Sequence, residues 1–218
     1  MNQAAVIFDM DGVICHTNPY HSLAFKSFFG KRNLFPTEAE FAEHMYGKSN
    51  SYILKHFLGR EIVGQEFLDL EFEKESLFRE IYANHIETIP NFLPFLISLK
   101  NAGLKTGVAT SAPRANLDLI MGHLGFEKNM ESILASENVS HHKPNPEVYL
   151  TSAAKLGVAP ANCLVFEDSF SGVSAGMNAG MKVVGVLSSH TKEELPPCIA
   201  YIKDYTDIDV ETVLNILR

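Results

Sequence analysis

Short apolar runs alternate along the chain with longer segments whose apolar residues recur at helical spacing. The runs have the length of buried strands and span residues 4–8, 105–110, 132–136, 162–167 and 182–187, with a weaker sixth at 198–202. The helical stripes between them consist of Leu117, Ile120, Met121 and Leu124, of Val148, Ala153, Leu156 and Val158, and of Phe170, Val173, Ala175 and Met177. This alternation predicts an α/β fold in which a doubly wound parallel sheet carries helices on both faces.

Residues 17–85 break this alternation, because they contain amphipathic helical patterns and no convincing strand. The helical segments span residues 18–32, 36–47, 50–59 and 64–86 and are separated by Gly or Pro. We therefore predict an inserted all-α domain at 17–85, with residues 1–16 and 86–218 forming the core that contains the sheet. The insertion leaves the sheet just after the first strand, so we expect it to cover the carboxyl edge, where open parallel sheets bind ligands.

Polar side chains follow four of the predicted strands. They are Asp9 and Asp11 after the first, Thr110 and Ser111 after the second, Lys143 near the third, and Glu167 and Asp168 after the fourth. Each taken alone could be a turn residue, a helix cap or a solvated charge. Parallel strands bring their carboxyl ends to one edge, however, and turn chemistry does not explain all of these residues together.

The physical requirements of phosphoryl transfer explain each of these residue types. One carboxylate attacks phosphorus, and a second carboxyl group protonates the leaving oxygen and then deprotonates water. A divalent cation such as Mg²⁺ offsets the repulsion between the carboxylates and the phosphate. A hydroxyl group, backbone N–H groups and a lysine neutralise the phosphoryl oxygens.

Four segments resemble the motifs of the haloacid dehalogenase superfamily of phosphotransferases: "DMDGV", "TS", "KPNPEVY" and "FEDSFSGVSAGMNAGM". Their order, and the helical insertion after the first, resemble the branch that holds β-phosphoglucomutase and small-metabolite phosphatases. The resemblance covers nearly the whole chain and implies a Rossmann-like core with a mobile helical cap. It also implies that Asp9 is the nucleophile and Asp11 the general acid and base. Members that act on carbon–halogen or phosphonate bonds lack an aspartate at the position of Asp11, so a phosphate ester or anhydride is the expected substrate.

The resemblance also implies how the remaining site residues act. Side chains of Asp9 and Asp168 and the backbone carbonyl of Asp11 would hold Mg²⁺, and Glu167 matches an acid of the metal shell. The transferring phosphoryl group would be held by Thr110 and Lys143 and by backbone amides of Ser111 and Ala112.

A mutase needs a second cationic grip for a bisphosphate, and the sequence departs from the family pattern there. In β-phosphoglucomutase-like chains an arginine follows a Lys-Gly hinge in the cap, and a lysine follows the second motif. Here Gly47 fits the hinge, but Asn50 and Pro113 fall where those cations would be. Lys48 and Arg114 lie nearby, although a lysine does not replace a bidentate arginine.

We therefore predict a Mg²⁺-dependent phosphohydrolase that acts on a small phosphorylated metabolite. β-Phosphoglucomutase or inorganic pyrophosphatase activity remains an alternative. A phospho-receiver signalling module is disfavoured, because its phosphorylated Asp follows a later strand and no helical lid is inserted. Thr17 and His21 match the hinge-and-cap pattern of the branch. His21 could position the general acid, contact substrate or simply pack at the hinge.

Composition and net charge restrict the classes of binding partner and the cellular compartment that we expect. The net charge of -8 disfavours binding to nucleic acid or to an acidic membrane surface. Cys15, Cys163 and Cys198 are widely spaced and show neither a disulfide framework nor a zinc motif, which indicates a reducing cytoplasm. The N-terminal pattern is not that of a signal peptide, and no run is long enough to span a membrane. We expect a cytoplasmic monomer.

Overall fold

The computed structural model describes residues 3–45 and 48–218. The chain divides into two compact units, one of Met1–His16 and Ile86–Arg218 and the other of Thr17–His85. We call the first the core unit and the second the helical unit. Among the described residues, no helix has both the length and the apolar composition needed to cross a membrane.

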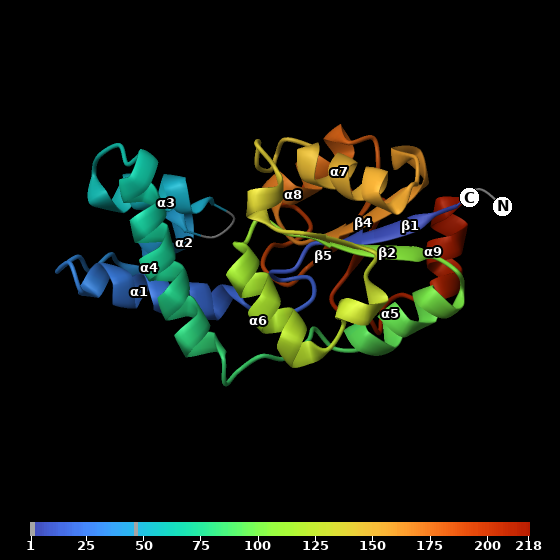
Figure 1. The fold of residues 1–218 in the computed structure, drawn as a ribbon, viewed down its shortest axis with the longest axis horizontal. Helices are drawn as coiled ribbons and strands as arrows, with labels where there is room; N and C mark the ends of the chain where they lie inside the picture. The colour runs from blue at the N-terminus through green and yellow to red at the C-terminus, as the bar shows by residue number, and fades with distance from the viewer. Residues whose placement is uncertain (1–2, 46–47) are drawn as a thin grey trace. The chain divides into compact units, whose positions relative to one another are not determined.

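The core unit contains a six-stranded parallel sheet with the order β3-β2-β1-β4-β5-β6 (Figure 1). The strands are β1 (Ala5–Phe8), β2 (Lys105–Ala109), β3 (Ser132–Leu134), β4 (Cys163–Glu167), β5 (Lys182–Val186) and β6 (Ala200–Ile202). Every neighbouring pair is parallel. This confirms the predicted doubly wound sheet, and it places the carboxyl ends of β1, β2 and β4 side by side.

Helices cover both faces of the sheet. The helices α7 and α8 lie on one side, and α5 and α6 lie on the other (Figure 1). Their bounds are α5 (Phe92–Asn101), α6 (Arg114–Leu124), α7 (Glu147–Leu156), α8 (Phe170–Asn178) and α9 (Val210–Leu217), with short 3-10 turns at Glu127–Asn129, Ser136–Asn138 and Pro160–Asn162. The helix α9 packs on α5 and β4.

The central strand β1 is buried on both faces, which explains its unbroken apolar sequence. Ile7 belongs to the cluster that includes Val148 and Ala153 of α7. The next side chain, Phe8, points to the opposite face, where its ring centre lies 5.3 Å from that of Phe92 in α5. Successive residues of β1 thus join the two apolar layers that enclose the sheet.

The apolar stripe that the sequence predicts on α8 is only partly correct. Val173 and Ala175 are buried, but Phe170 is 60% exposed and Met177 is 46% exposed. The buried face of α8 also includes two glycines, and at Gly176 a Cβ would lie 2.8 Å from Val183. The helix therefore approaches the sheet through small residues, which an apolar stripe does not reveal.

The helical unit contains α1 (Asn18–Gly30), α2 (Glu38–His44), α3 (Asn50–Leu58) and α4 (Gly64–Tyr82). The helices α1 and α4 pack together. Its own apolar core consists of Phe25, Phe28, Phe29, Phe41, Met45, Ile53, Leu54 and Ile62. A separate core of this kind is consistent with an inserted domain.

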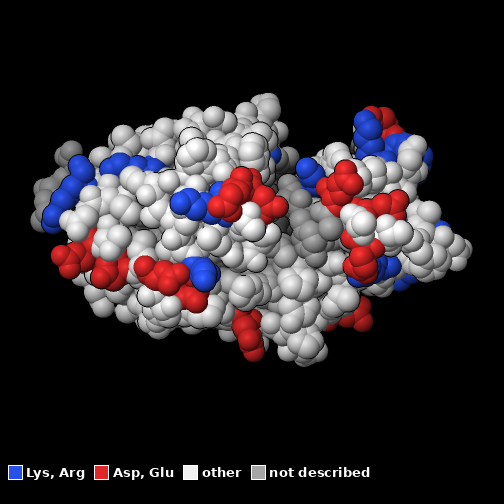
Figure 2. Space-filling model, turned by 180° about the vertical axis from the view of Figure 1, so that it is seen from behind, with Lys and Arg blue, Asp and Glu red and all other residues white. Residues whose placement is uncertain are grey.

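The surface drawn in Figure 2 carries basic and acidic side chains interspersed over the described residues. This mixture fits the net charge of -8 and differs from the broad basic face that nucleic-acid binding requires.

Candidate active site

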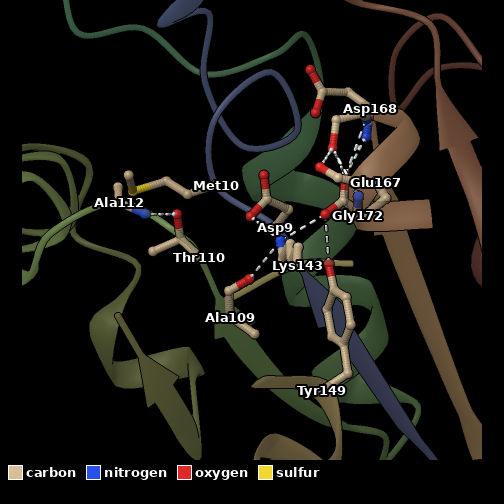
Figure 3. A network of polar contacts seen from close by, with 12 residues as sticks. Asp9, Met10, Ala109, Thr110, Ala112, Lys143, Tyr149, Glu167, Asp168 and Gly172 are labelled. Carbon is tan, nitrogen blue, oxygen red and sulfur yellow. Dashed lines mark hydrogen bonds and ion pairs between the residues drawn. The ribbon is translucent and has the colours of Figure 1, made fainter. Parts of the chain in front are cut away.

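Asp9 stands at the carboxyl end of β1, where the central position of that strand fixes its backbone. Its amide donates a hydrogen bond to the carbonyl oxygen of Phe166, at 3.0 Å, which extends the pairing of β1 with β4. Asp9 is 7% exposed, and its side chain points toward Lys143 (Figure 3). The backbone and the carboxylate of Asp9 are therefore both held in place at the edge of the sheet.

Lys143 reaches the same point from the loop before α7. Its Nζ donates hydrogen bonds to Oδ1 of Asp9 at 2.7 Å, to Oε1 of Glu167 at 2.6 Å and to the carbonyl oxygen of Ala109 at 3.3 Å. The ammonium group also lies 4.9 Å from the ring centre of Tyr149. Lys143 therefore joins the ends of β1, β2 and β4 through one buried positive charge.

Glu167 is completely buried, and its two carboxylate oxygens accept five hydrogen bonds. Oε1 accepts from Lys143 and from the Tyr149 hydroxyl, the latter at 2.7 Å. Oε2 accepts from the amides of Asp168 and Ser169 and from the Ser169 hydroxyl. Since a carboxylate offers about four lone-pair sites, Glu167 mainly contributes its charge and orients Lys143.

Gly172 makes this arrangement possible. It lies in the first turn of α8, and a Cβ at this position would be 1.7 Å from Oε1 of Glu167. Ser169 caps the same helix, because its Oγ accepts a hydrogen bond from the amide of Gly172 at 3.0 Å. Ser169 is therefore the N-cap of α8, and the neighbouring Asp168 side chain accepts from Ser188 and Ser189 instead.

Asp168 is buried beside the loop that follows β1. Its Oδ2 accepts hydrogen bonds from Ser189 and, at 3.4 Å, from Ser188. Gly12 adopts a left-handed conformation with φ of +72°, and a Cβ there would lie 2.0 Å from Oδ2 of Asp168. Gly12 is therefore required both for the bend after Asp11 and for the close approach of the two loops.

Thr110 follows β2 and is buried, whereas the neighbouring Ser111 is exposed. The Thr110 hydroxyl accepts a hydrogen bond from the amide of Ala112 at 3.0 Å, and Figure 3 shows it across from Asp9. Neither Thr110 nor Ser111 caps α6: Pro113 precedes that helix, and the Glu137 carboxylate accepts from the Arg114 amide. The Thr110 side chain therefore faces the site and has no role as a helix cap.

Burial shifts the ionisation of the site residues. It raises the pKa of Asp9 to about 7, against the attraction of Lys143, and the charges of Glu167 and Asp11 add to the increase. The pKa of Asp168 is raised well above its ordinary value by burial and then by Glu167 and Asp9. Burial alone would lower the pKa of Lys143, but Asp9 and Glu167 raise it. The lysine is therefore a permanent cation among carboxylates that repel one another.

The buried carboxylates fit a hard divalent cation. Asp9, Glu167 and Asp168 each offer one oxygen, and these oxygens all lie within 4.8 Å of one another. Oxygen ligands in this number suit Mg²⁺, which keeps part of its water shell. A cation there would also relieve the repulsion that raises the pKa values of Asp9 and Asp168.

Asp11 and Arg114 are the other predicted site residues of the core unit. Asp11 is half-buried, and its charge contributes to the raised pKa of Asp9, so the two carboxyl groups are electrostatically linked. Arg114 is exposed, and its Nε forms an ion pair with Oδ1 of Asp118, one turn further along α6, at 2.7 Å. The guanidinium group of Arg114 is thus directed along its own helix.

The remaining predicted residues belong to the helical unit. Thr17 is buried, and its carbonyl oxygen accepts from the amide of His21. His21 stacks on Phe78 with ring centres 3.8 Å apart, and its Nδ1 lies 2.8 Å from Nζ of Lys74. Lys48 is exposed, with its Nζ 5.7 Å from the ring centre of Tyr52. The prediction for Gly47 lies outside the described residues.

Several residues of this site were missed in the sequence. Tyr149 lies within the "KPNPEVY" segment and is completely buried under Lys143. Ser188, Ser189 and His190 follow β5, the strand next to β4, and all of them contact Asp168. A search for polar residues after every predicted strand, including β5, would have found this second group.

The parallel sheet, with buried acids and one lysine at its carboxyl edge, agrees with the haloacid dehalogenase superfamily. The profile of the haloacid dehalogenase-like hydrolases matches residues 6–186, and the chain belongs to this family. It is an enzyme that acts on phosphate esters, which decides against the receiver-module alternative.

Relatives with assigned activities lie on both sides of the hydrolase–mutase distinction. The chain is 30% identical over 184 residues to a fructose-1-phosphate phosphatase of Escherichia coli, covering 84% of this chain and 96% of that protein. It is 33% identical over 191 residues to the β-phosphoglucomutase of Bacillus subtilis, covering 84% and 82%. A solved hydrolase of this family from Entamoeba histolytica superposes with a TM-score of 0.92 at 26% identity, covering 99% of each chain.

Proposed function

We propose that the protein is a Mg²⁺-dependent phosphohydrolase that acts on a small phosphorylated metabolite through an aspartyl phosphate on Asp9. The observation that carries this proposal is the convergence of Asp9, Lys143, Glu167 and Asp168 at the carboxyl ends of adjacent strands. Relatives that act on sugar phosphates support a sugar phosphate as the substrate.

The residues of the core unit divide the work of the reaction. A carboxylate oxygen of Asp9 attacks phosphorus, and the bond between phosphorus and the ester oxygen breaks. Asp11 donates its proton to the departing oxygen. It then removes a proton from the water that attacks the aspartyl phosphate, which releases inorganic phosphate and restores Asp9.

Donors around Asp9 hold the transferring group. We assign Lys143, the Thr110 hydroxyl and the amides of Ser111 and Ala112 to the phosphoryl oxygens. Asp9 and Asp168 and the backbone carbonyl of Asp11 would hold Mg²⁺, with Glu167 supplying further negative charge. When bound, the ion neutralises the phosphate and the carboxylates around it.

Hydrolysis is favoured over mutase chemistry because Asn50 and Lys74 of the helical unit are both paired with carboxylates. The Asn50 amide donates to Oε1 of Glu71 at 2.9 Å and to Oε1 of Glu75 at 2.8 Å. Lys74 is 2% exposed and forms an ion pair with Glu75 at 2.7 Å. Carboxylates around Asn50 repel rather than bind a second phosphate.

We further propose that the helical unit is the substrate-selecting cap, since it is inserted between β1 and the rest of the core unit. Thr17, His21, Lys48 and Arg114 are the residues we assign to substrate contact or cap movement. Cys15, Cys163 and Cys198, all within the described residues, form no disulfide, which is compatible with a reducing cytoplasm, where we place the enzyme as a monomer.

A screen of phosphorylated metabolites with Mg²⁺ tests this function. Fructose 1-phosphate, β-glucose 1-phosphate and pyrophosphate would be compared for phosphate release and for isomer formation. We expect phosphate release from a sugar monophosphate, and none from the Asp9→Asn variant, which should remain folded. Isomer formation would establish the mutase, and selective pyrophosphate cleavage the pyrophosphatase. Retained activity in Asp9→Asn would reject the nucleophile.

A further inference from the structure

The loop after β5 places two serine hydroxyls against the site, although it lies outside the four motifs. The hydroxyl of Ser189 donates to Oδ2 of Asp168 and lies 3.3 Å from the carbonyl oxygen of the same residue. The hydroxyl of Ser188 donates to the carbonyl oxygen of Gly12. The two side chains therefore connect the loops that follow β1 and β4.

This loop is held firmly by its neighbours. The strand β5 pairs with β4 and with β6, and the amide of Leu187 donates to the carbonyl oxygen of Ile202 at 2.8 Å. Nδ1 of His190 lies 3.0 Å from the carbonyl oxygen of Asp168. Ser189 thus presents its hydroxyl from a fixed backbone.

A carboxylate that binds a cation through one oxygen is oriented by what holds the other oxygen. A hydrogen-bond donor to the second oxygen strengthens cation binding. Without it, the carboxylate side chain must be ordered when the ion binds, and this ordering costs free energy. Asp168 is 4% exposed, and its pKa is raised by burial and by Glu167 and Asp9. The Ser189 hydrogen bond acts in the opposite direction and favours the ionised form.

We propose that Ser189 is a positioning residue that fixes Oδ2 of Asp168 and so directs the other carboxylate oxygen toward the divalent ion. This inference rests on the proposed function, in which Asp168 is a metal ligand. Ser188 has a different task, because its hydroxyl is committed to the Gly12 carbonyl and lies 3.4 Å from Oδ2 of Asp168.

The test is a calorimetric titration of Mg²⁺ alone into the full chain. We expect the Ser189→Ala variant to bind Mg²⁺ about 10- to 100-fold more weakly than the unaltered protein. Turnover should fall at low Mg²⁺ and recover at saturating Mg²⁺, because the substitution weakens ion binding and leaves Asp9, Asp11 and Lys143 in place. Thermal unfolding without metal should change little.

Two comparison variants separate positioning from a general loss of packing. Ser152→Ala also removes a buried hydroxyl, one that donates to Ser132 at 3.0 Å, and should leave Mg²⁺ affinity unchanged. Ser188→Ala should weaken Mg²⁺ binding much less than Ser189→Ala.

The outcomes distinguish this inference from the proposed function. Unchanged Mg²⁺ affinity in Ser189→Ala, in a protein that binds Mg²⁺ and releases phosphate, would overturn the role of Ser189 alone. Equal losses in Ser188→Ala and Ser189→Ala would also overturn it, because anchoring of the loop would then be responsible. Failure of the unaltered protein to bind Mg²⁺ would overturn both proposals.

Discussion

Lys143 and Asp9 are 134 residues apart in the chain, and their side chains meet at 2.7 Å in an ion pair that is almost completely buried. Taking two charges out of water is costly, and such pairs contribute little stability beyond what a packed apolar pair would provide. A buried pair that also contacts Glu167 is therefore better explained by chemistry than by folding.

Replacing Lys143 by Met should reduce kcat by about 100- to 1,000-fold, the usual cost of removing one charge-stabilising donor. The loss has two causes: the phosphoryl oxygens lose a cation, and the pKa of Asp9 rises further without the attraction of Lys143. Steady-state hydrolysis of p-nitrophenyl phosphate at saturating Mg²⁺ measures the effect. Lys105→Met is the matched control, because the Lys105 ammonium group donates to a backbone carbonyl, that of Leu156, at 2.6 Å and to no carboxylate of the site. A kcat within a few-fold of the unaltered protein would exclude this role for Lys143.

Gly172→Ala should lower both stability and activity, although alanine normally favours a helix by about 1 kcal/mol over glycine. The added Cβ would lie 1.7 Å from Oε1 of Glu167, so the carboxylate must move and release Lys143. Gly122→Ala is the control, because Gly122 lies in α6 and a Cβ added there would meet open space among the described residues. Thermal unfolding should show a lower Tm for Gly172→Ala and an unchanged or higher Tm for Gly122→Ala. Equal Tm values would contradict the crowding at Gly172.

The sheet could be predicted because its strands are buried on both faces and therefore appear as short, unbroken apolar runs. Two helices of the core unit were not singled out. The helix α5 contains Pro94 in its first turn, where proline is tolerated but reads as a break in the pattern. The helix α9 is a short segment at the end of the chain that packs on α5, so its apolar face depends on a distant partner.

The sequence could predict the site residues that follow a strand or belong to a motif. Asp9, Thr110, Lys143 and Asp168 each follow a strand or lie within a recognisable segment, and parallel pairing brings those ends together. Contacts between distant side chains were not predictable: spacing gives no sign that His21 meets Lys74, 53 residues away. Nor does the sequence distinguish Glu167, whose oxygens accept five hydrogen bonds, from its neighbour Asp168.

Asp11→Asn should slow both formation and breakdown of the aspartyl phosphate by about 100- to 10,000-fold, the usual range for a general acid and base. An amide neither donates the proton that an alkoxide needs nor removes one from water. Formation from p-nitrophenyl phosphate should be slowed less, because nitrophenolate leaves without a proton. Rapid-quench measurement of the phosphorylated protein separates the two steps. Unchanged rates for both steps with a sugar phosphate would remove Asp11 from the mechanism.

Mg²⁺ should stabilise the protein more at about pH 8 than at about pH 5.5, because protons and the ion compete for the same carboxylates. Burial raises the pKa of Asp9 from 3.8 to about 7 in the folded protein. Between these values the folded state retains a proton that the unfolded chain has released. The free energy of unfolding of the metal-free protein should therefore fall as the pH rises through this interval.

Thermal unfolding with and without Mg²⁺ across this pH range measures both effects. The raised pKa of Asp168 acts in the same direction as that of Asp9, because its main cause is also burial. Asp9→Asn should weaken the pH dependence of the free energy of unfolding and should remove most of the gain in Tm from Mg²⁺. The amide neither titrates nor binds the ion as a carboxylate does. Asp69→Asn, on the exposed surface of α4, should preserve both. A Mg²⁺-dependent gain in Tm that is equal at both pH values would show that Asp9 is ionised in the metal-free protein and that burial does not control its charge.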